Sequence, residues 1–227
     1  MVVLSTVSFR AMNQARSIKR ITRLLRIIVW ILAAIGVAMV VRRVLILAGV
    51  IQSVNPAGGP PFDTGFGRHP AITLLHILPG LLFMLLGPLQ FMSSLRLRHV
   101  RFYRRSRVVF FVCAYIVGLS ALSMPLIMKP IGGVNEAAGS ILFAIFFLVA
   151  LSRWVGYLRM KNETLAREWR IRAFAIGLAI ATVRPIMVLF FAFSGLPPSV
   201  FFGTAFWIGF TLHLMAAETW INYTRGE

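Results

Sequence analysis

The sequence predicts an all-α polytopic membrane protein: a bundle of six transmembrane helices with both termini in the cytoplasm. Three observations lead to this fold class. The 227 residues are 59% hydrophobic and 13% charged, with a mean hydropathy of +0.83, whereas soluble domains carry about 25% charged residues. Six apolar stretches reach the length of about 20 residues that a helix needs to cross the hydrocarbon. The basic residues gather in connectors that would all lie on one side of the membrane.

The first three stretches are separated by connectors of different kinds. The first covers residues 24–41, with an extension to residue 51 as an alternative end. A segment rich in Gly and Pro follows, and residues 55–61 within it are incompatible with a helix. The second stretch, 70–92, contains Pro79 and Pro88, and each proline removes a backbone hydrogen bond, so we expect this helix to bend. The arginine-rich connector 93–107 then leads into the third stretch, 108–128.

The last three stretches are separated by two turns and a second charged connector. A Lys-Pro-Ile-Gly-Gly turn precedes the fourth stretch, and a Ser-Gly-Leu-Pro-Pro turn precedes the sixth. The charged connector 159–170 precedes the fifth. We expect these stretches at 137–158, 171–193 and 200–221. The chain thus divides into a basic cytoplasmic tail at 1–23, one transmembrane domain at 24–223 and a short cytoplasmic tail at 224–227.

The distribution of basic residues predicts the orientation. Of 24 Lys and Arg residues, 19 lie in the two tails and the two charged connectors or in the residues that flank them, which share one side of a six-helix chain, and four lie on the other side. The positive-inside rule places the richer side in the cytoplasm. Because the basic start lacks a clear cleavage site, we interpret the first stretch as a signal anchor of a multi-pass protein in the cell (inner) membrane. A mitochondrial transit peptide is the alternative interpretation of an arginine-rich, acid-free start.

The net charge of +18 indicates lipid rather than nucleic acid as the partner. The basic residues occupy short blocks between apolar stretches, which is the pattern of membrane topology and of binding to anionic headgroups at the cytoplasmic face. A nucleic-acid interface would instead place them on one face of a soluble domain. Cys113 is the single cysteine, so the chain cannot form an internal disulfide, and no Cys/His cluster suggests a zinc or other metal site.

One face of the second stretch carries polar and small residues. His69, His76, Gly80, Gly87 and Gln90 are separated by 7, 4, 7 and 3 positions, which keeps them near one face of a helix. Small residues let membrane helices approach closely, so packing is one interpretation of this face. The other is a slot for a flat cofactor, with a histidine as axial ligand to the iron of haem b.

The sixth stretch holds His213 and, five residues later, Glu218. His213 is either a hydrogen-bonding group between helices or, with His76, Gly80 and Gly87, part of a cofactor site. At 1.5 Å of rise per residue, His76 lies about 10 Å and His213 about 20 Å from the outer surface, so a single haem does not bridge both easily. We expect Glu218 to pair with an arginine of the cytoplasmic side.

Arg184 is the most costly residue of the predicted membrane region. An arginine about 14 residues into a spanning helix costs several kcal/mol unless it meets a partner or a water-filled cavity. We expect no acidic residue at its depth. Our hypothesis is that Arg184, Arg42 and Arg43 form a basic pocket in the outer half of the membrane, which holds a lipid headgroup, a propionate or a substrate carboxylate. The alternative is that Arg184 snorkels to the outer interface.

Several short motifs resemble those of the uncharacterised membrane family called domain of unknown function 2306. They span roughly residues 25–223, and the most specific is Gly-Pro-Leu-Gln-Phe at 87–91. The others are His76-Ile77, Gly80, Arg104 with Ser106-Arg107, Glu168-Trp169-Arg170-Ile171-Arg172, Arg184 and Glu218.

The resemblance implies a membrane fold but no particular activity. Members of this family commonly have a histidine before the arginine of the second connector and another before the tryptophan of the fourth connector. Here those positions hold Tyr103 and either Ala166 or Arg167. A metal or haem role based on those two histidines is therefore not implied for this chain.

Three functional hypotheses follow from the sequence. The first is a membrane redox protein associated with haem or a quinone, in which His76 binds the cofactor. The second is a carrier for a small anionic or lipid-like solute, which uses the arginine pocket. The third is a non-catalytic accessory subunit whose glycine face packs on a membrane partner or on a second copy of the chain. No motif for a nucleophile, a zinc protease or a phosphate loop is present, so the sequence does not decide whether the protein is an enzyme.

Overall fold

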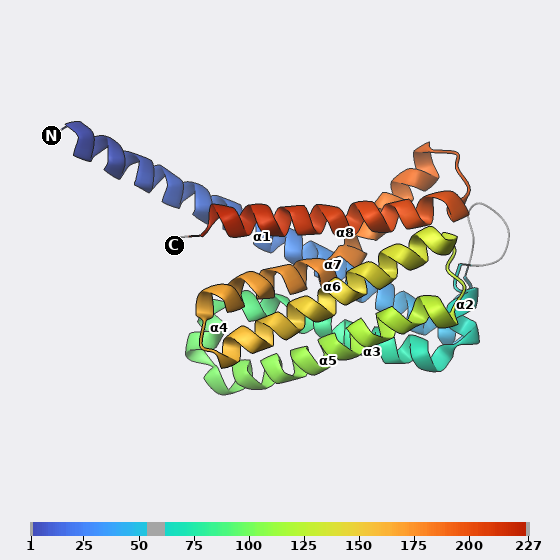
Figure 1. Cartoon of the computed structure of the whole chain (residues 1–227). Helices are drawn as coiled ribbons and strands as arrows, with labels where there is room; N and C mark the ends of the chain where they lie inside the picture. The colour runs from blue at the N-terminus through green and yellow to red at the C-terminus, as the bar shows by residue number, and fades with distance from the viewer. Residues whose placement is uncertain (1, 54–61, 226–227) are drawn as a thin grey trace.

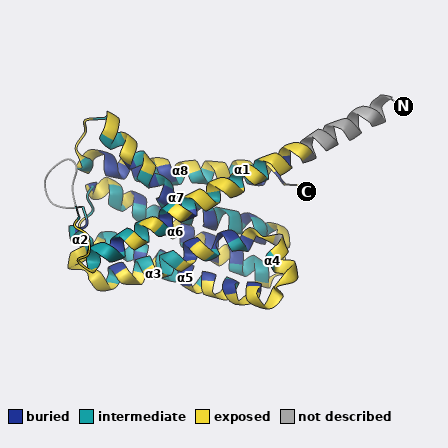
Figure 2. Cartoon of the chain, turned by 180° about the vertical axis from the view of Figure 1, so that it is seen from behind, coloured by how far each residue is buried: buried dark blue, intermediate teal, exposed yellow. Residues whose placement is uncertain are grey.

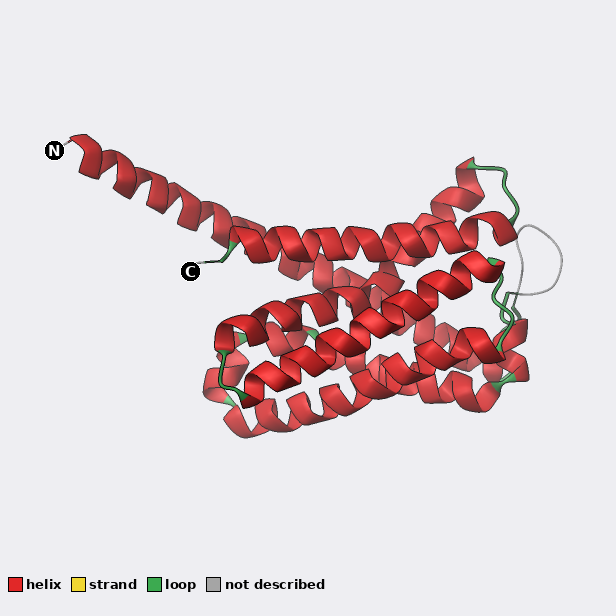
Figure 3. Cartoon of the chain, in the orientation of Figure 1, coloured by secondary structure: helices red, strands yellow, loops and turns green. Residues whose placement is uncertain are grey.

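The computed structural model describes residues 2–53 and 62–225, with side chains considered from residue 16 onward. Every regular element in these ranges is helical (Figure 3). In chain order the elements are α1 Val2–Leu47, α2 Thr64–Arg68, α3 Pro70–Leu86, the short 3₁₀ helix η1 Pro88–Phe91, α4 Ser93–Arg98, α5 Val100–Ile127, α6 Gly133–Arg159, α7 Glu163–Phe193 and α8 Pro198–Tyr223.

Six helical segments are long and apolar enough to cross a membrane, which confirms the predicted fold class. They are Arg16–Leu47, Pro70–Phe91, Val100–Ile127, Gly133–Arg159, Glu163–Phe193 and Pro198–Tyr223. The spans alternate in direction, so α1 enters and α8 leaves the bundle at the same end (Figure 1). We call this the termini end, and we call the opposite end, which holds the α1–α3, α5–α6 and α7–α8 connections, the loop end.

The helices extend beyond the predicted stretches. The connector predicted at 93–107 is helical, because α4 and the first two turns of α5 occupy it, and α7 begins at Glu163 rather than at residue 171. Apolar composition marks the part of a helix that lies in lipid, whereas arginine-rich turns are good helix formers outside it. The side chain of Asn162 also caps α7 by accepting a hydrogen bond from the amide of Leu165 at 3.0 Å.

The loop between the first two spans contains a short helix, and the two prolines of the second span lie in different elements. The structure adds the short helix α2 to the loop between the first two spans. The prediction for residues 55–61 and the last two residues of the C-terminal tail, 226–227, lie outside the described residues. Helix α3 runs through Pro79, whereas Pro88 opens η1, so the regular α-helix ends just before this second proline.

Five helices form a closed ring at the centre of the molecule. Helix α1 packs on α3, α3 on α5, α5 on α6, α6 on α7, and α7 returns to α1, while α8 lies against α6 and α7. Buried residues gather on the parts of the helices that face the inside of the bundle, and exposed residues lie on its outside (Figure 2). Many of the exposed residues are large and apolar, as expected of a bundle solvated by lipid.

An aromatic cluster fills the middle of the ring and its half toward the termini end. The Phe83 ring lies 4.9 Å from that of Phe110 and 5.6 Å from that of Phe147, measured between centroids. Phe174 and Trp154 complete the cluster. Gly87 makes this packing possible, because a β-carbon there would overlap the Phe174 ring. The opposite half of the ring, toward the loop end, is not filled in this way.

Candidate functional site

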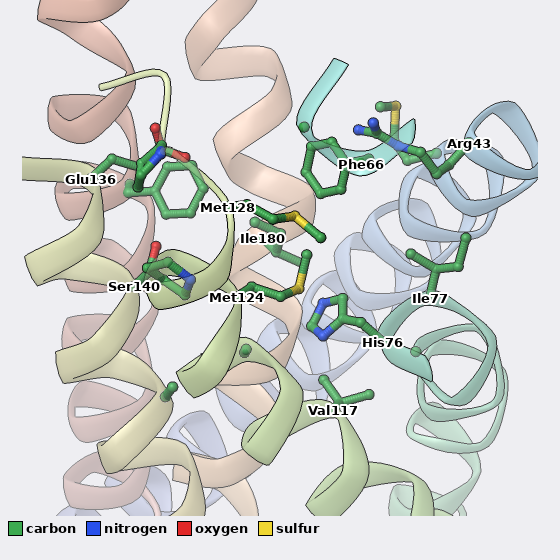
Figure 4. A pocket seen from close by; sticks show the side chains of 18 of the residues that line it. Arg43, Phe66, His76, Ile77, Val117, Met124, Met128, Glu136, Ser140 and Ile180 are labelled. Carbon is green, nitrogen blue, oxygen red and sulfur yellow. The ribbon is translucent and has the colours of Figure 1, made fainter. Parts of the chain in front are cut away.

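A cavity of about 910 Å³ occupies the loop-end half of the helix ring (Figure 4). Its walls come from α1, α2, α3, α5, α6, α7 and the start of α8. Phe83 and Phe147 belong both to the cavity wall and to the aromatic cluster, so the cluster closes the cavity toward the termini end. The volume falls within the range of about 300–1,000 Å³ that is usual for small-molecule sites.

The cavity wall is mostly apolar, with its charges gathered near the loop end. Methionine, isoleucine and phenylalanine side chains form the deeper part. Among the described residues of the wall, the bases Arg43, Arg68, Lys129 and Arg184 outnumber one acid, Glu136. The site therefore combines an apolar interior with a positively charged mouth, and it suits a molecule with an apolar body and an anionic head.

Asp63 joins the first loop to the end of α1. Its buried carboxylate pairs with Arg42 at 3.0 Å and with Arg43, and it accepts a hydrogen bond from the Ser53 hydroxyl. Burial alone would raise the pKa of this carboxyl group, but the hydroxyl and the two guanidinium groups together hold the pKa below its ordinary value of 3.8. Arg43 also lies over the ring of Phe66, 3.7 Å from the centroid. Two of the three arginines of the predicted pocket are thus already paired.

The carboxylate of Glu136 binds a backbone amide at the start of its own helix. The carboxylate accepts a hydrogen bond from the backbone amide of Gly132 at 2.7 Å, which satisfies one of the free N–H groups before α6. Figure 4 shows Glu136 and Arg43 on opposite sides of the cavity mouth. The carboxylate of Glu136 therefore contributes negative charge to the mouth without binding a basic side chain directly.

Arg184 is the basic residue of the cavity that lacks a direct acidic partner. Within the described residues, no carboxylate oxygen lies within 4.0 Å of its guanidinium, whose one hydrogen-bonding contact is with the sulfur of Met187 at 3.9 Å. Asp63 and Glu136 attract it from a longer distance. Protein atoms enclose the side chain, and it keeps accessible surface because it faces the cavity. Such a cation is costly in a membrane unless water or a ligand anion completes its environment.

His76 lies deeper in the cavity, on α3. Its Nδ1 atom is 2.9 Å from the hydroxyl oxygen of Ser120 on α5. The Ser120 hydroxyl lies 2.6 Å from the backbone carbonyl of Ile116 and 3.0 Å from that of Val117. With its one hydrogen donated to these carbonyls, its oxygen accepts from the Nδ1–H group in the matching tautomer of the imidazole. The lone pair of the ring then resides on Nε2. Figure 4 shows the ring projecting into the cavity between Val117 and Met124.

The structure separates the other residues of the predicted cofactor face. His69 and Gly80 line the cavity with His76, but Gly87 packs under Phe174, outside it. The ring of His213 bonds to the Thr182 hydroxyl at 2.7 Å and is not part of the cavity wall. His76 and His213 therefore do not face a common space. On the glycine face of α3, Gly80 faces Val117 of α5 and Gly87 faces Phe174 of α7.

Gln90 and Glu218 belong to a polar network at the termini end. The backbone carbonyl of Gln90 accepts a hydrogen bond from Arg170 at 3.3 Å. Arg172 binds both carboxylate oxygens of Glu218, at 2.6 and 2.9 Å, and lies 3.5 Å from Glu168. This network joins the Gly-Pro-Leu-Gln-Phe segment to the Glu-Trp-Arg-Ile-Arg segment, and it leaves no acid of the network unpaired.

Sequence reasoning missed both acids of the loop end. The sequence placed no acid at the depth of Arg184, but Asp63 and Glu136 both attract it from a distance in the structure. Glu136 stands one residue before the predicted fourth stretch, whereas Arg184 lies nine residues in from the end of the fifth stretch at residue 193, so counting residues placed them at different depths. Asp63 lies in a loop that no periodicity describes, and only the fold brings it to Arg43.

Comparison with known proteins gives one match. The family model described as "Predicted membrane protein (DUF2306)" matches residues 73–221. No curated protein and no solved structure matches the chain. The matched region contains α5, α6 and α7 entirely and most of α3 and α8, whereas α1 and the Asp63 loop precede it.

Proposed function

The chain belongs to the DUF2306 family of predicted membrane proteins, and from this premise we propose that it binds an amphiphilic anion in the cavity at its loop end. The ligand would place its apolar body against the methionine and phenylalanine side chains and its anionic head between Arg184 and Arg43. With the predicted orientation, the head would lie in the outer half of the cell membrane, and the ligand would be a small anionic or lipid-like solute.

One observation carries this proposal: Arg184 faces the cavity without an acidic partner among the described residues. The two acids near it are occupied, Asp63 by Arg42, Arg43 and Ser53, and Glu136 by the start of α6. A ligand carboxylate or phosphate would supply the missing charge. A charge-assisted hydrogen bond contributes about 1.5–3 kcal/mol, which corresponds to roughly 10- to 150-fold in affinity.

The test is binding of hexadecanoate and of its uncharged methyl ester to the protein in lipid nanodiscs, with empty nanodiscs as the reference. We expect the wild-type protein to bind the acid at least about 10-fold more tightly than the ester. Arg184→Leu should lose most of this preference while it keeps the affinity for the ester, and Arg184→Lys should retain part of it. Arg153→Leu is the matched control, because Arg153 is an exposed arginine outside the cavity wall.

Two outcomes would contradict the proposal. One is no binding of hexadecanoate above that of empty nanodiscs, and the other is an unchanged acid preference in Arg184→Leu. A thermal unfolding curve for each variant shows whether it is folded. Flux of hexadecanoate in proteoliposomes then separates a carrier from a protein that only binds.

Haem b is a second candidate ligand, favoured by the orientation of His76. Its Nδ1–H group is held by Ser120, which leaves Nε2 for a metal, as is usual for metal-binding histidines. His213 would not be the second axial ligand, but Met124 lines the cavity beside His76. An absorbance spectrum of protein purified from its host decides this candidate: a Soret band that His76→Ala removes would support haem, and its absence after haem is supplied would exclude it.

A further inference from the structure

His76 offers a second polar contact to a ligand that Arg184 holds by its head. The imidazole Nδ1–H group is committed to Ser120, whose own hydrogen goes to the backbone of α5. The acceptor nitrogen, Nε2, remains on a ring that lines the cavity. Its neighbours there are apolar, with Val117 and Met124 on either side (Figure 4). A lone pair that faces a largely apolar cavity is unfavourable unless a donor reaches it.

The opposite wall of the cavity is also polar at one point. Ser140 lies on α6, one turn from Glu136, and Figure 4 shows it across the cavity from His76. Other serines of the membrane helices, such as Ser120, Ser123 and Ser152, donate to the carbonyl one turn earlier. Ser140 makes no such bond within the part of the chain that the structure describes. The middle of the cavity therefore presents an acceptor on one side and a hydroxyl on the other.

His213, the other histidine within the membrane helices, differs from His76 in its surroundings. His213 lies in the same bundle, but its ring is satisfied by the hydroxyl of Thr182 at 2.7 Å, and it takes no part in the cavity wall. His213 thus joins two helices of the chain. His76 uses one nitrogen in the same way, to join α3 to α5, and presents the other to the cavity.

We infer that the ligand carries a hydroxyl, or another O–H or N–H donor, on its apolar body, and that Nε2 of His76 accepts from it. This inference rests on the proposed function, since it concerns the same cavity. It narrows the ligand from any amphiphilic anion to one with two polar points: a charged head at Arg184 and a donor at the depth of His76. A simple saturated fatty acid would occupy the cavity without satisfying His76.

The experiment compares hexadecanoate with a panel of hexadecanoates that carry one hydroxyl group at successive carbons. Binding is measured in nanodiscs for the wild-type protein, His76→Phe, His76→Gln and the control His213→Phe. We expect at least one isomer to bind wild-type protein about 3- to 10-fold more tightly than hexadecanoate, the effect of one net hydrogen bond. His76→Phe should bring the affinities for the hydroxylated and the plain acid to the same value, His76→Gln should restore part of the difference through its amide oxygen, and His213→Phe should leave the difference unchanged.

The possible failures are distinguishable. If hexadecanoate binds but no isomer gains, or if the gain persists in both His76 variants, the inference is wrong and the proposed function stands. If hexadecanoate does not bind, the proposed function fails and this inference fails with it. A Soret band that depends on His76 would assign Nε2 to iron and would also overturn the inference. Because two variants are used, a folding defect in His76→Phe still leaves His76→Gln to decide the matter.

Discussion

The two ends of the bundle use the same residue types in opposite ways. At the termini end, Arg172 has two acidic partners and Glu168 has two basic ones, so these two charges are each compensated by more than one neighbour. At the loop end, Asp63 alone serves Arg42 and Arg43, and Arg184 has no direct acidic partner within the described residues. Inside the helix ring, aromatic side chains fill the half toward the termini end, whereas the half toward the loop end holds a cavity. A second aromatic cluster at the loop end packs between α7 and α8, outside this cavity.

This difference distinguishes charges that stabilise the fold through ion pairs from charges that are available to bind a ligand. The shared ion pairs of the termini end restrain the helices on which they lie, and each acid of this network has a basic partner, although Nε of Arg170 and Oε1 of Gln90 are buried there without a hydrogen-bond partner in the described part of the chain. An excess of positive charge around a cavity is costly to keep in a membrane, so its presence needs a reason other than stability. The following predictions test this contrast, beginning with the largest expected effect.

The first prediction concerns Asp63, on which the loop end depends. Asp63→Asn removes the one carboxylate shared by Arg42 and Arg43 and leaves their charges beside that of Arg184. Removing one partner of a buried ion pair costs about 3–5 kcal/mol, and partial exposure of Arg42 reduces this to about 3 kcal/mol. We expect thermal unfolding in detergent to occur several degrees lower. An unchanged unfolding temperature would show that the Asp63 pairs do not hold the loop to α1.

Lowering the pH should reduce the stability of the wild-type protein in the same way as Asp63→Asn. The pKa of Asp63 lies below its ordinary value of 3.8, because the Ser53 hydroxyl and the two arginines outweigh the effect of burial. A group whose pKa is lowered by folding stabilises the folded state above the ordinary pKa, and this stabilisation disappears as the pH falls through the lowered value. We therefore expect unfolding temperatures measured from pH 6 to pH 3 to fall more steeply below pH 4 for wild-type protein than for Asp63→Asn. If the unfolding temperatures of the two proteins fell in parallel with pH, the acid-induced loss of stability would not come from Asp63.

The second prediction concerns Glu168 at the termini end. Glu168→Gln breaks the contacts with Arg172 and Arg225, but Arg172 keeps both bonds to Glu218, and Arg225 is half exposed. The loss should therefore be about 1–2 kcal/mol, smaller than for Asp63 although Glu168 has as many ion-pair partners. Thermal unfolding measures the loss, and hexadecanoate affinity should not change. A loss of affinity would mean that the two ends are coupled.

The third prediction is a substitution that should leave the stability unchanged or raise it. Arg184→Leu removes a cation with no direct acidic partner from the membrane region and replaces it with an apolar side chain. We expect the protein without ligand to be as stable as wild type or more stable, by up to about 2 kcal/mol. Unfolding temperatures in ligand-free detergent solution give the comparison. A marked destabilisation would show that Arg184 is structural, and it would remove the main support for the binding site.

Much of the fold follows from hydropathy, whereas the site follows only in part. Spans of about 20 apolar residues must become helices in lipid, because no other local structure satisfies the backbone there. Arg184 and His76 could be identified as candidates because polar groups in such spans are costly. Their partners could not be identified, since Asp63, Ser120 and Glu136 reach the cavity through loop geometry and helix rotation. Helix ends were also missed, because arginine-rich turns such as that at Arg104 continue helices beyond the lipid.

The fourth and smallest effect concerns Phe66, whose ring lies under the guanidinium of Arg43. Phe66→Leu keeps an apolar side chain in the cavity wall but removes the ring face that attracts the cation. Such contacts contribute about 0.5–2 kcal/mol, and the partner Asp63 continues to hold Arg43, so a loss of about 0.5–1 kcal/mol is expected. Released from the ring, Arg43 should also turn more readily toward a bound anion.

Thermal unfolding of Phe66→Leu should therefore show a drop of a few degrees at most, while the affinity for hexadecanoate is unchanged or slightly higher. Phe91→Leu is the matched control at the termini end, because Arg170 lies 5.0 Å from the centroid of the Phe91 ring. That substitution should cost stability by a similar amount without any effect on affinity. If both variants change affinity equally, the loop end has no special relation to the ligand, and the contrast between the two ends fails.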